Sequence, residues 1–113
     1  SEVMNLIGEV EGRTCILVDD IVDSAGTLCN AAGALIEAGA QKVSAYVTHG
    51  VLSGAACDRV NASKLEKLLF TNTIAPTEAI LASDKFEIIK IAPLIGEAMR
   101  RTADEHSVSS LFD

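Results

Sequence analysis

Residues 16–27 read ILVDDIVDSAGT, and this stretch decides the fold class of the chain. An apolar run ends in paired acids, a short loop of small and polar residues follows, and then an apolar helical pattern begins. This order is typical of an α/β protein that forms a binding loop at the carboxyl end of a buried strand. The loop offers two chemistries, because carboxylates bind hydroxyl groups, directly or through Mg²⁺, while backbone N–H groups at a helix start bind phosphate. A sugar phosphate carries both groups.

The sequence on either side predicts strands that alternate with helices. Apolar residues recur at helical spacing over Thr27–Ala38, and Gly39 stands where the glycine that ends a helix belongs. A short helix is predicted to be capped by Ser53 and to run through Val60, and a last helix begins near Pro93. Strands are expected over residues 3–10, 15–18, 42–48, 68–71 and 86–91, while residues 75–83 stay ambiguous. These elements predict an α/β fold with a doubly wound, largely parallel sheet and helices on both faces.

The chain of 113 residues has the composition of one globular domain, with 49% hydrophobic and 4% aromatic residues. Its formal net charge of −7 argues against a nucleic-acid partner, because phosphate backbones require clustered Lys and Arg. No apolar run has the length of a membrane span or the flanks of a signal peptide, so no membrane partner is expected. Cys15, Cys29 and Cys57 are widely spaced among apolar residues, which favours buried, reduced cysteines of a cytoplasmic protein.

The residue types in the loop suit a sugar phosphate. Side chains alternate along a strand, so Asp19 and Asp20 are expected on opposite faces, one toward a ligand and the other supporting the loop or a metal. Asp23 and Ser24 are good N-terminal helix residues that satisfy free N–H groups, and Gly26 lets the backbone approach a ligand. The alternative is a capped strand-to-helix turn whose acids only interact with the helix dipole. The candidate binding residues are Asp19, Asp20, Asp23, Ser24, Ala25, Gly26 and Thr27.

Residues 18–27 resemble the phosphoribosyl-diphosphate (PRPP) loop of the type I phosphoribosyltransferase fold. Four further stretches narrow the resemblance, namely EVMN at 2–5, THG with SG within 48–54, TNTI at 71–74, and EAMRR followed by SVSSLF within 97–112. In this order they are similar to the C-terminal part of the ribose-phosphate pyrophosphokinases, the PRPP synthetase family. The PRPP loop alone indicates the superfamily, and the four other stretches make the resemblance specific.

The resemblance implies an enzyme that moves the diphosphate of ATP to the 1-hydroxyl of ribose 5-phosphate and releases AMP. Asp19 would hold ribose hydroxyls with Asp20 close by, and residues 23–27 would cradle the 5-phosphate. In this family the ATP site, the main Mg²⁺ ligands and a loop with a catalytic Lys and Arg lie upstream of these stretches. Residues 1–113 are therefore expected to be a single, incomplete C-terminal domain, inactive alone and without catalytic residues or metal ligands. Its partners would be ribose 5-phosphate, ATP and its own copies in a homo-oligomer, a hexamer built from dimers.

Two loop positions depart from the family pattern. Ser24 stands where the family often has Thr, and Ala25 where it often has Gly or Cys. Because Ser keeps the hydroxyl and Ala is small, phosphate binding is expected to survive, provided that position 25 does not need a positive φ.

The tail carries a second set of candidate residues. Ser107, Ser109 and Phe112 match positions that, in bacterial members of the family, help to form a regulatory nucleotide site between subunits. A compatible alternative is a chain end that docks on the fold through Leu111 and Phe112. His49 is expected to be a structural histidine with a hydrogen-bond partner. Arg100 and Arg101 are expected to interact with the dipole of the preceding helix.

Two other functions stay open. A phosphoribosyltransferase that consumes PRPP shares the loop, but it usually has a hood region for the base, and the four flanking stretches argue against it. A non-catalytic regulatory homologue would bind a nucleotide or a catalytic partner. Its loop is usually degraded, whereas this one keeps its acids, Gly26 and Thr27.

Overall fold

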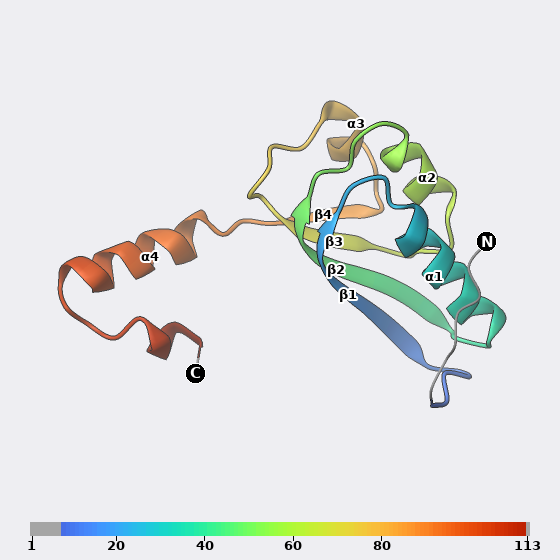
Figure 1. The fold of residues 1–113 in the computed structure, drawn as a ribbon, viewed down its shortest axis with the longest axis horizontal. Coiled ribbons are helices and arrows are strands. Elements are labelled where there is room, and N and C mark those ends of the chain that lie inside the picture. The colour runs from blue at the N-terminus through green and yellow to red at the C-terminus, as the bar shows by residue number, and fades with distance from the viewer. Residues whose placement is uncertain (1–7, 113) are drawn as a thin grey trace.

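Four parallel strands form the centre of the fold (Figure 1), for which the computed structural model describes residues 8–112. The strands lie in the order β1-β2-β3-β4, and each neighbouring pair is parallel. The predicted α/β class with a parallel sheet is therefore confirmed. The strands are β1 (Thr14–Val22), β2 (Lys42–Gly50), β3 (Leu68–Thr71) and β4 (Phe86–Ile89).

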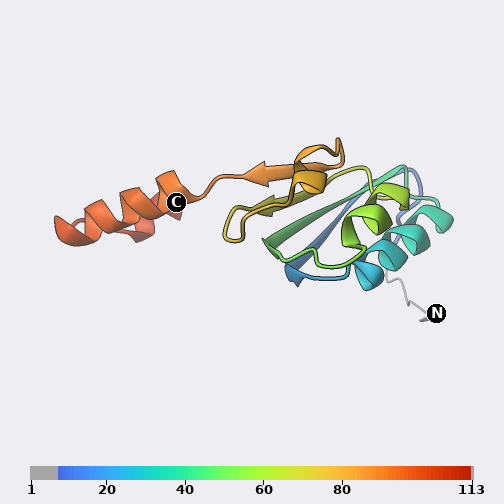
Figure 2. The ribbon, with the colours of Figure 1, turned by 90° about the horizontal axis from the view of Figure 1, so that it is seen from above.

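Three helices form the crossovers between consecutive strands, α1 (Gly26–Glu37), α2 (Ala56–Ala62) and α3 (Glu78–Leu81). Crossovers between parallel strands are right-handed, and each one here advances in the same direction across the sheet, which places the helices on the same face. Figure 2 shows α1 and α2 together on that face. Within residues 8–112 the helices thus cover one face and not both, because a doubly wound sheet needs a reversal of strand order that these four strands do not have.

The core lies between the covered face and the helices. Alternate residues of β2 point inward, so that Val43, Ala45 and Val47 are buried. Gly39 follows α1 with a φ of +103°, which glycine adopts without strain, and the helix therefore ends within one residue of the predicted end. The same cluster contains Leu68 and Phe70 of β3, Leu28, Ala32 and Leu35 of α1, Val60 of α2 and Ile80 of α3.

The opposite face of the sheet is apolar and exposed. On β1, Val18 is 79% exposed and Ile16 is 50% exposed. Tyr46, the register partner of Val18 on β2, is 44% exposed. A contiguous apolar surface of this kind is typical of an interaction surface.

The boundaries differ from the predicted ones mainly at β1. This strand runs to Val22, four residues beyond the predicted end, so both acids of the pair belong to the strand itself. Residues 75–83 contain one helical turn, α3, in which the Thr77 hydroxyl accepts a hydrogen bond from the Ile80 N–H at 3.4 Å. Of the strand predicted over residues 3–10, residues 3–7 lie outside the described part, and residues 8–10 are irregular.

Helix α4 (Ala92–Ala103) and a 3₁₀ turn (Ser109–Phe112) extend away from the sheet (Figure 1). Pro93 stands in the first turn of α4, as predicted. None of the α4 residues, all of which the structure describes, is buried, and Leu94, Ile95 and Met99 are exposed. No helix among residues 8–112 has the length and apolar content that crossing a membrane requires.

Candidate functional site at the carboxyl end of β1

The end of β1 and the start of α1 enclose a cavity of about 300 Å³. Six of the seven predicted binding residues line it, and Asp20 does not. The alternation of side chains along β1 separates the two acids, as predicted. The Asp20 N–H instead donates a hydrogen bond to Oδ1 of Asp19 at 2.8 Å. The walls are formed by Asp19, Ile21, Val22, Asp23, Ser24, Ala25, Gly26, Thr27 and Leu28.

The first turn of α1 is open toward this cavity. Ala25 is the N-terminal cap residue, and no side chain caps the helix. The first backbone bond runs from the N–H of Cys29 to the carbonyl of Ala25 at 3.0 Å, which leaves the N–H groups of residues 26–28 without a helical acceptor. The prediction that Asp23 and Ser24 satisfy these groups is wrong. An uncapped helix start carries partial positive charge and is suited to bind an anion.

Position 25 has a positive φ, the conformation identified from the sequence as the condition unfavourable to alanine there. Ala25 has a φ of +66° and a ψ of +9°, in the left-handed region. This region raises the energy of an L-residue with a side chain by about 1–2 kcal/mol. The Ala25 side chain is 4% exposed and packs in the core, so the surrounding structure holds the strained turn in place.

The carboxylate of Asp23 is held by the loop that follows β2. Oδ1 of Asp23 accepts hydrogen bonds from the hydroxyl of Ser53 and from its N–H, the latter at 3.4 Å. The prediction that Ser53 caps the next helix is therefore wrong. Helix α2 begins at Ala56, its cap residue is Ala55, and no side chain caps it. Ser53 joins the β2–α2 loop to the β1–α1 loop instead.

Three more donors from this part of the chain hold the loop. The N–H groups of Val51 and Leu52 both donate to the carbonyl of Val22, at 2.9 and 3.3 Å. The guanidinium of Arg59, on α2, donates to the carbonyl of Ser24. Residues 51–59, which we call the bracing segment, thus contact residues 22–24, immediately before the strained cap.

Ser53 and Arg59 were not identified from the sequence as residues that hold the loop. Ser53 belongs to the SG pair that supported the resemblance, which was the available signal, but local pattern favoured a helix cap. Arg59 lies 35 residues from its acceptor Ser24, and no local pattern connects the two.

The two acids that line the cavity, Asp19 and Asp23, belong to no set of metal ligands among the described residues. Among residues 8–112 no group of three or more His, Cys, Asp or Glu side chains is arranged to hold one. Mg²⁺ in phosphoryl-transfer sites is often held by one or two carboxylates together with substrate phosphates.

Comparison with known families identifies the chain. The family model of the phosphoribosyl synthetase-associated domain matches residues 2–113. The chain belongs to this family.

Curated relatives of the chain are ribose-phosphate pyrophosphokinases, which confirms the resemblance to that family. The chain is 59% identical to the protein of Mesorhizobium japonicum and 61% identical to that of Caulobacter vibrioides, over 113 residues in each case. The alignments cover 100% of the chain and 36% of each relative, so the chain spans about a third of their length. A crystal structure of phosphoribosylpyrophosphate synthetase from Mycobacterium smegmatis matches with a TM-score of 0.82 and 36% identity, over 88% of this chain and 33% of that one.

Two other stretches that carried the resemblance to the synthetase family meet at the same end of the sheet. His49, near the end of β2, forms a hydrogen bond through Nδ1 with the hydroxyl of Thr73 at 2.8 Å. It thus has the partner expected of a structural histidine. Gly50 is required by close packing, because a Cβ there would lie 2.8 Å from Cδ2 of Phe70.

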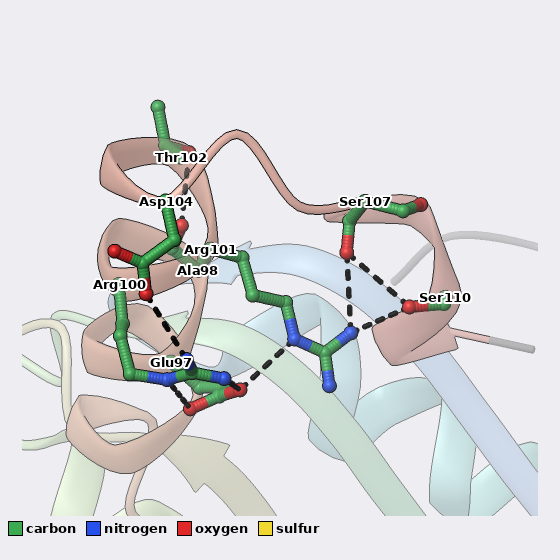
Figure 3. Close-up of polar contacts among 8 residues, drawn as sticks. All are labelled: Glu97, Ala98, Arg100, Arg101, Thr102, Asp104, Ser107 and Ser110. Carbon is green, nitrogen blue, oxygen red and sulfur yellow. Dashed lines mark hydrogen bonds and ion pairs between the residues drawn. The ribbon is translucent and has the colours of Figure 1, made fainter.

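The two arginines of α4 connect the helix to the tail (Figure 3). They lie in the last turn, as the dipole expectation requires. Arg101 also donates to Oε1 of Glu97 at 2.9 Å, to the carbonyl of Ser107 at 3.2 Å and to the hydroxyl of Ser110 at 2.5 Å. Arg100 contacts both oxygens of Glu97, at 2.6 and 3.0 Å. Hydrogen bonds from Arg100 and Arg101 lower the pKa of Glu97 from 4.5 to about 2.

The tail residues predicted to bind a regulatory nucleotide are local neighbours. The hydroxyls of Ser107 and Ser109 lie 3.0 Å apart, and Phe112 is the last residue of the 3₁₀ turn. The side chain of Phe112 lies outside what the structure describes. A nucleotide role for these three residues stays a prediction.

Proposed function

We propose that this chain forms the ribose 5-phosphate half-site of a ribose-phosphate diphosphokinase. The enzyme would transfer the diphosphate of ATP to the 1-hydroxyl of ribose 5-phosphate and give PRPP and AMP. The observation that carries the proposal is the combination of the uncapped start of α1 and the carboxylate of Asp19 in one cavity of about 300 Å³. The names of the relatives support the same reaction.

Each part of the loop has a role in this proposal. The N–H groups of residues 26–28 donate to oxygens of the 5-phosphate, and the hydroxyl of Thr27 adds a further donor. Asp19 accepts hydrogen bonds from ribose hydroxyls, and Asp20 supports the strand end beside it. The sugar is thereby held at both ends, so that its 1-hydroxyl keeps a fixed position for in-line transfer. Positioning supplies much of the rate in reactions of this class.

The remaining parts of the enzyme would lie outside these 113 residues. We propose that residues 1–113 are one incomplete, C-terminal domain of a longer cytoplasmic chain that contributes the ATP site, the Mg²⁺ ligands and the catalytic groups elsewhere. The 36% coverage of the relatives supports a longer chain, and so do the exposed sheet face and the unburied helix α4. We further propose a homo-oligomer, a hexamer built from dimers, with Ser107, Ser109 and Phe112 in a regulatory nucleotide site between subunits.

Titration of ribose 5-phosphate into the chain, followed by backbone amide shifts in NMR, tests the half-site. We expect saturable shifts centred on residues 19–27, stronger than those caused by inorganic phosphate. Thr27→Val keeps the shape but removes the hydroxyl, and Asp19→Ala removes the carboxylate, so both should weaken binding about tenfold or more. Thr14→Val is the matched control, because Thr14 is exposed at the far end of β1.

The same titration on the full-length protein, together with assays of turnover, separates the alternatives. Turnover of ribose 5-phosphate and ATP to PRPP supports the synthetase, whereas release of diphosphate from PRPP and a base would identify a phosphoribosyltransferase. Loop shifts without turnover in the full-length protein would identify a regulatory homologue. Absence of loop shifts in both the folded chain and the full-length protein would contradict the half-site.

A further inference from the structure

Two side chains of the bracing segment contact the loop between β1 and α1 without lining its cavity. Ser53 holds the carboxylate of Asp23, and Arg59 holds the carbonyl of Ser24. We propose that Ser53 and Arg59 are positioning residues of the ribose 5-phosphate half-site, an inference that rests on the function proposed above. They act on the ligand through residues 23–25.

The contact between Ser53 and Asp23 bears on the repulsion between the Asp23 carboxylate and a bound phosphate. Asp23 lines the same cavity as the open N–H groups of α1, so its carboxylate repels a phosphate that enters there. Two donors of Ser53, the hydroxyl and the N–H at 3.4 Å, converge on one oxygen, Oδ1. Hydrogen bonds to a carboxylate disperse its charge and fix its direction. Ser53 therefore reduces the repulsion that Asp23 exerts on the phosphate.

The contact between Arg59 and Ser24 holds the backbone of the loop in place. The carbonyl of Ser24 belongs to the peptide unit that leads into Ala25, whose φ of +66° turns the chain into α1. A fixed carbonyl fixes that peptide plane, which also contains the N–H of Ala25, and so restricts the orientation in which the chain enters the first turn of α1. The guanidinium also brings a positive charge to a loop that carries Asp23 and follows Asp19. Arg59 therefore favours both the strained turn and the binding of an anion.

The two contacts span 30 and 35 residues of sequence, so they join two separate crossovers of the sheet. Both contacts lie at the end of the sheet where we propose that ribose 5-phosphate binds, and neither Ser53 nor Arg59 lines the cavity. Loss of either contact should therefore weaken the binding of ribose 5-phosphate and leave the binding of ATP unchanged.

Steady-state kinetics of the full-length enzyme test this assignment. We expect Ser53→Ala and Arg59→Gln each to raise KM for ribose 5-phosphate about tenfold, with KM for ATP within twofold of the wild type. Ser53→Thr keeps the hydroxyl and should restore KM for ribose 5-phosphate to within about threefold. Asp58 is the exposed neighbour of Arg59 on α2, so Asp58→Asn is the matched control and should change neither KM.

A second experiment tests the charge argument. In an Asp23→Asn background the repulsive charge is gone, so adding Ser53→Ala should raise KM for ribose 5-phosphate less than twofold. The inhibition constant of inorganic phosphate against ribose 5-phosphate should follow the same pattern. Melting temperatures of all variants, measured in parallel, separate a loosened loop from a destabilised fold.

The outcomes distinguish the inference from the function on which it rests. If Thr27→Val raises KM for ribose 5-phosphate while Ser53→Ala and Arg59→Gln leave it unchanged, the half-site stands and the positioning role is overturned. Equal changes in KM for ribose 5-phosphate and for ATP also overturn it, because they indicate a general structural effect. If Thr27→Val has no effect on ribose 5-phosphate either, the proposed function itself fails.

Discussion

Replacement of Ala25 by glycine measures the strain stored in the loop between β1 and α1. Ala25 has a φ of +66° and is 4% exposed. Glycine relieves a left-handed strain of about 1–2 kcal/mol. Glycine also removes a buried methyl group, which costs about 0.8 kcal/mol of stability. In addition, it raises the conformational entropy of the unfolded chain, which costs about 0.4–1 kcal/mol more. The gain and the losses nearly cancel, so Ala25→Gly should change the free energy of unfolding by no more than about 0.8 kcal/mol in either direction.

Ala40 provides a matched control. It is 7% exposed, packs in the same core cluster and lies in a connection, between α1 and β2, with a negative φ. Ala40→Gly therefore brings both losses and no relief of strain, and should destabilise the fold by about 1.5 kcal/mol. The difference between the two variants, about 1–2 kcal/mol, isolates the energy of the left-handed conformation.

Urea unfolding of the chain followed by far-UV circular dichroism measures both values, since the chain has no Trp for fluorescence. The two variants should have the same dependence on urea concentration as the wild type, so that midpoints compare directly. If Ala25→Gly loses as much stability as Ala40→Gly, then position 25 is not strained and the reasoning is refuted. A result near zero for Ala25 alone would show that this loop is held in a conformation its own residue disfavours.

In the full-length enzyme, Asp19→Asn should raise KM for ribose 5-phosphate about tenfold, and Asp20→Asn should raise it less than about threefold. The reason is that, of these two acids, Asp19 alone lines the cavity. Equal effects of the two variants on KM would contradict this assignment. The pKa of Glu97 is depressed from 4.5 to about 2, so the stability it contributes is present above pH 4.5 and is lost as the pH falls toward 2. Carboxyl ¹³C titration should give a midpoint near 2, whereas one near 4.5 would disprove the contact with the arginines. Val18 is 79% exposed on the apolar face of the sheet. In the isolated chain, Val18→Lys should therefore change the free energy of unfolding by no more than about 0.5 kcal/mol and should reduce the binding of a hydrophobic dye. Unchanged dye binding would argue against an exposed apolar face.

The fold was predictable wherever the signal was local. Helical spacing over residues 27–38 and the following glycine placed α1 within one residue at each end. The end of β1 was not predictable, because pairing decides it. Asp19 pairs with Val47 and Ile21 with His49, so the strand continues past the acids for as long as β2 accompanies it. A single sequence contains no register, and local polarity therefore ended the predicted strand too early.

The candidate site divides in the same way. Its cavity-lining residues are nearly consecutive, so the order of acids, small residues and helix was enough to name six of the nine, although it missed Ile21, Val22 and Leu28 and added Asp20. The bracing segment comes from the next crossover, and its contacts depend on how two connections pack at one end of the sheet. The exposed sheet face has a comparable origin. Its strands have the apolar composition of a sheet covered on both sides, while strand order alone determines that these helices cover one side.

The capping residues explain how the site arises from its sequence. Asp23 and Ser24 are residues that ordinarily cap a helix, and a cap contributes about 1 kcal/mol. Here the carboxylate of Asp23 is engaged by Ser53 and the carbonyl of Ser24 by Arg59, so the cap position falls to Ala25, which has no polar side chain. The fold thus forgoes a cap and accepts a strained residue at the same turn. Both deficits are local, and both lie where an anion would supply the missing acceptor. A bound phosphate would therefore stabilise the helix start, because it completes a turn that the sequence leaves incomplete.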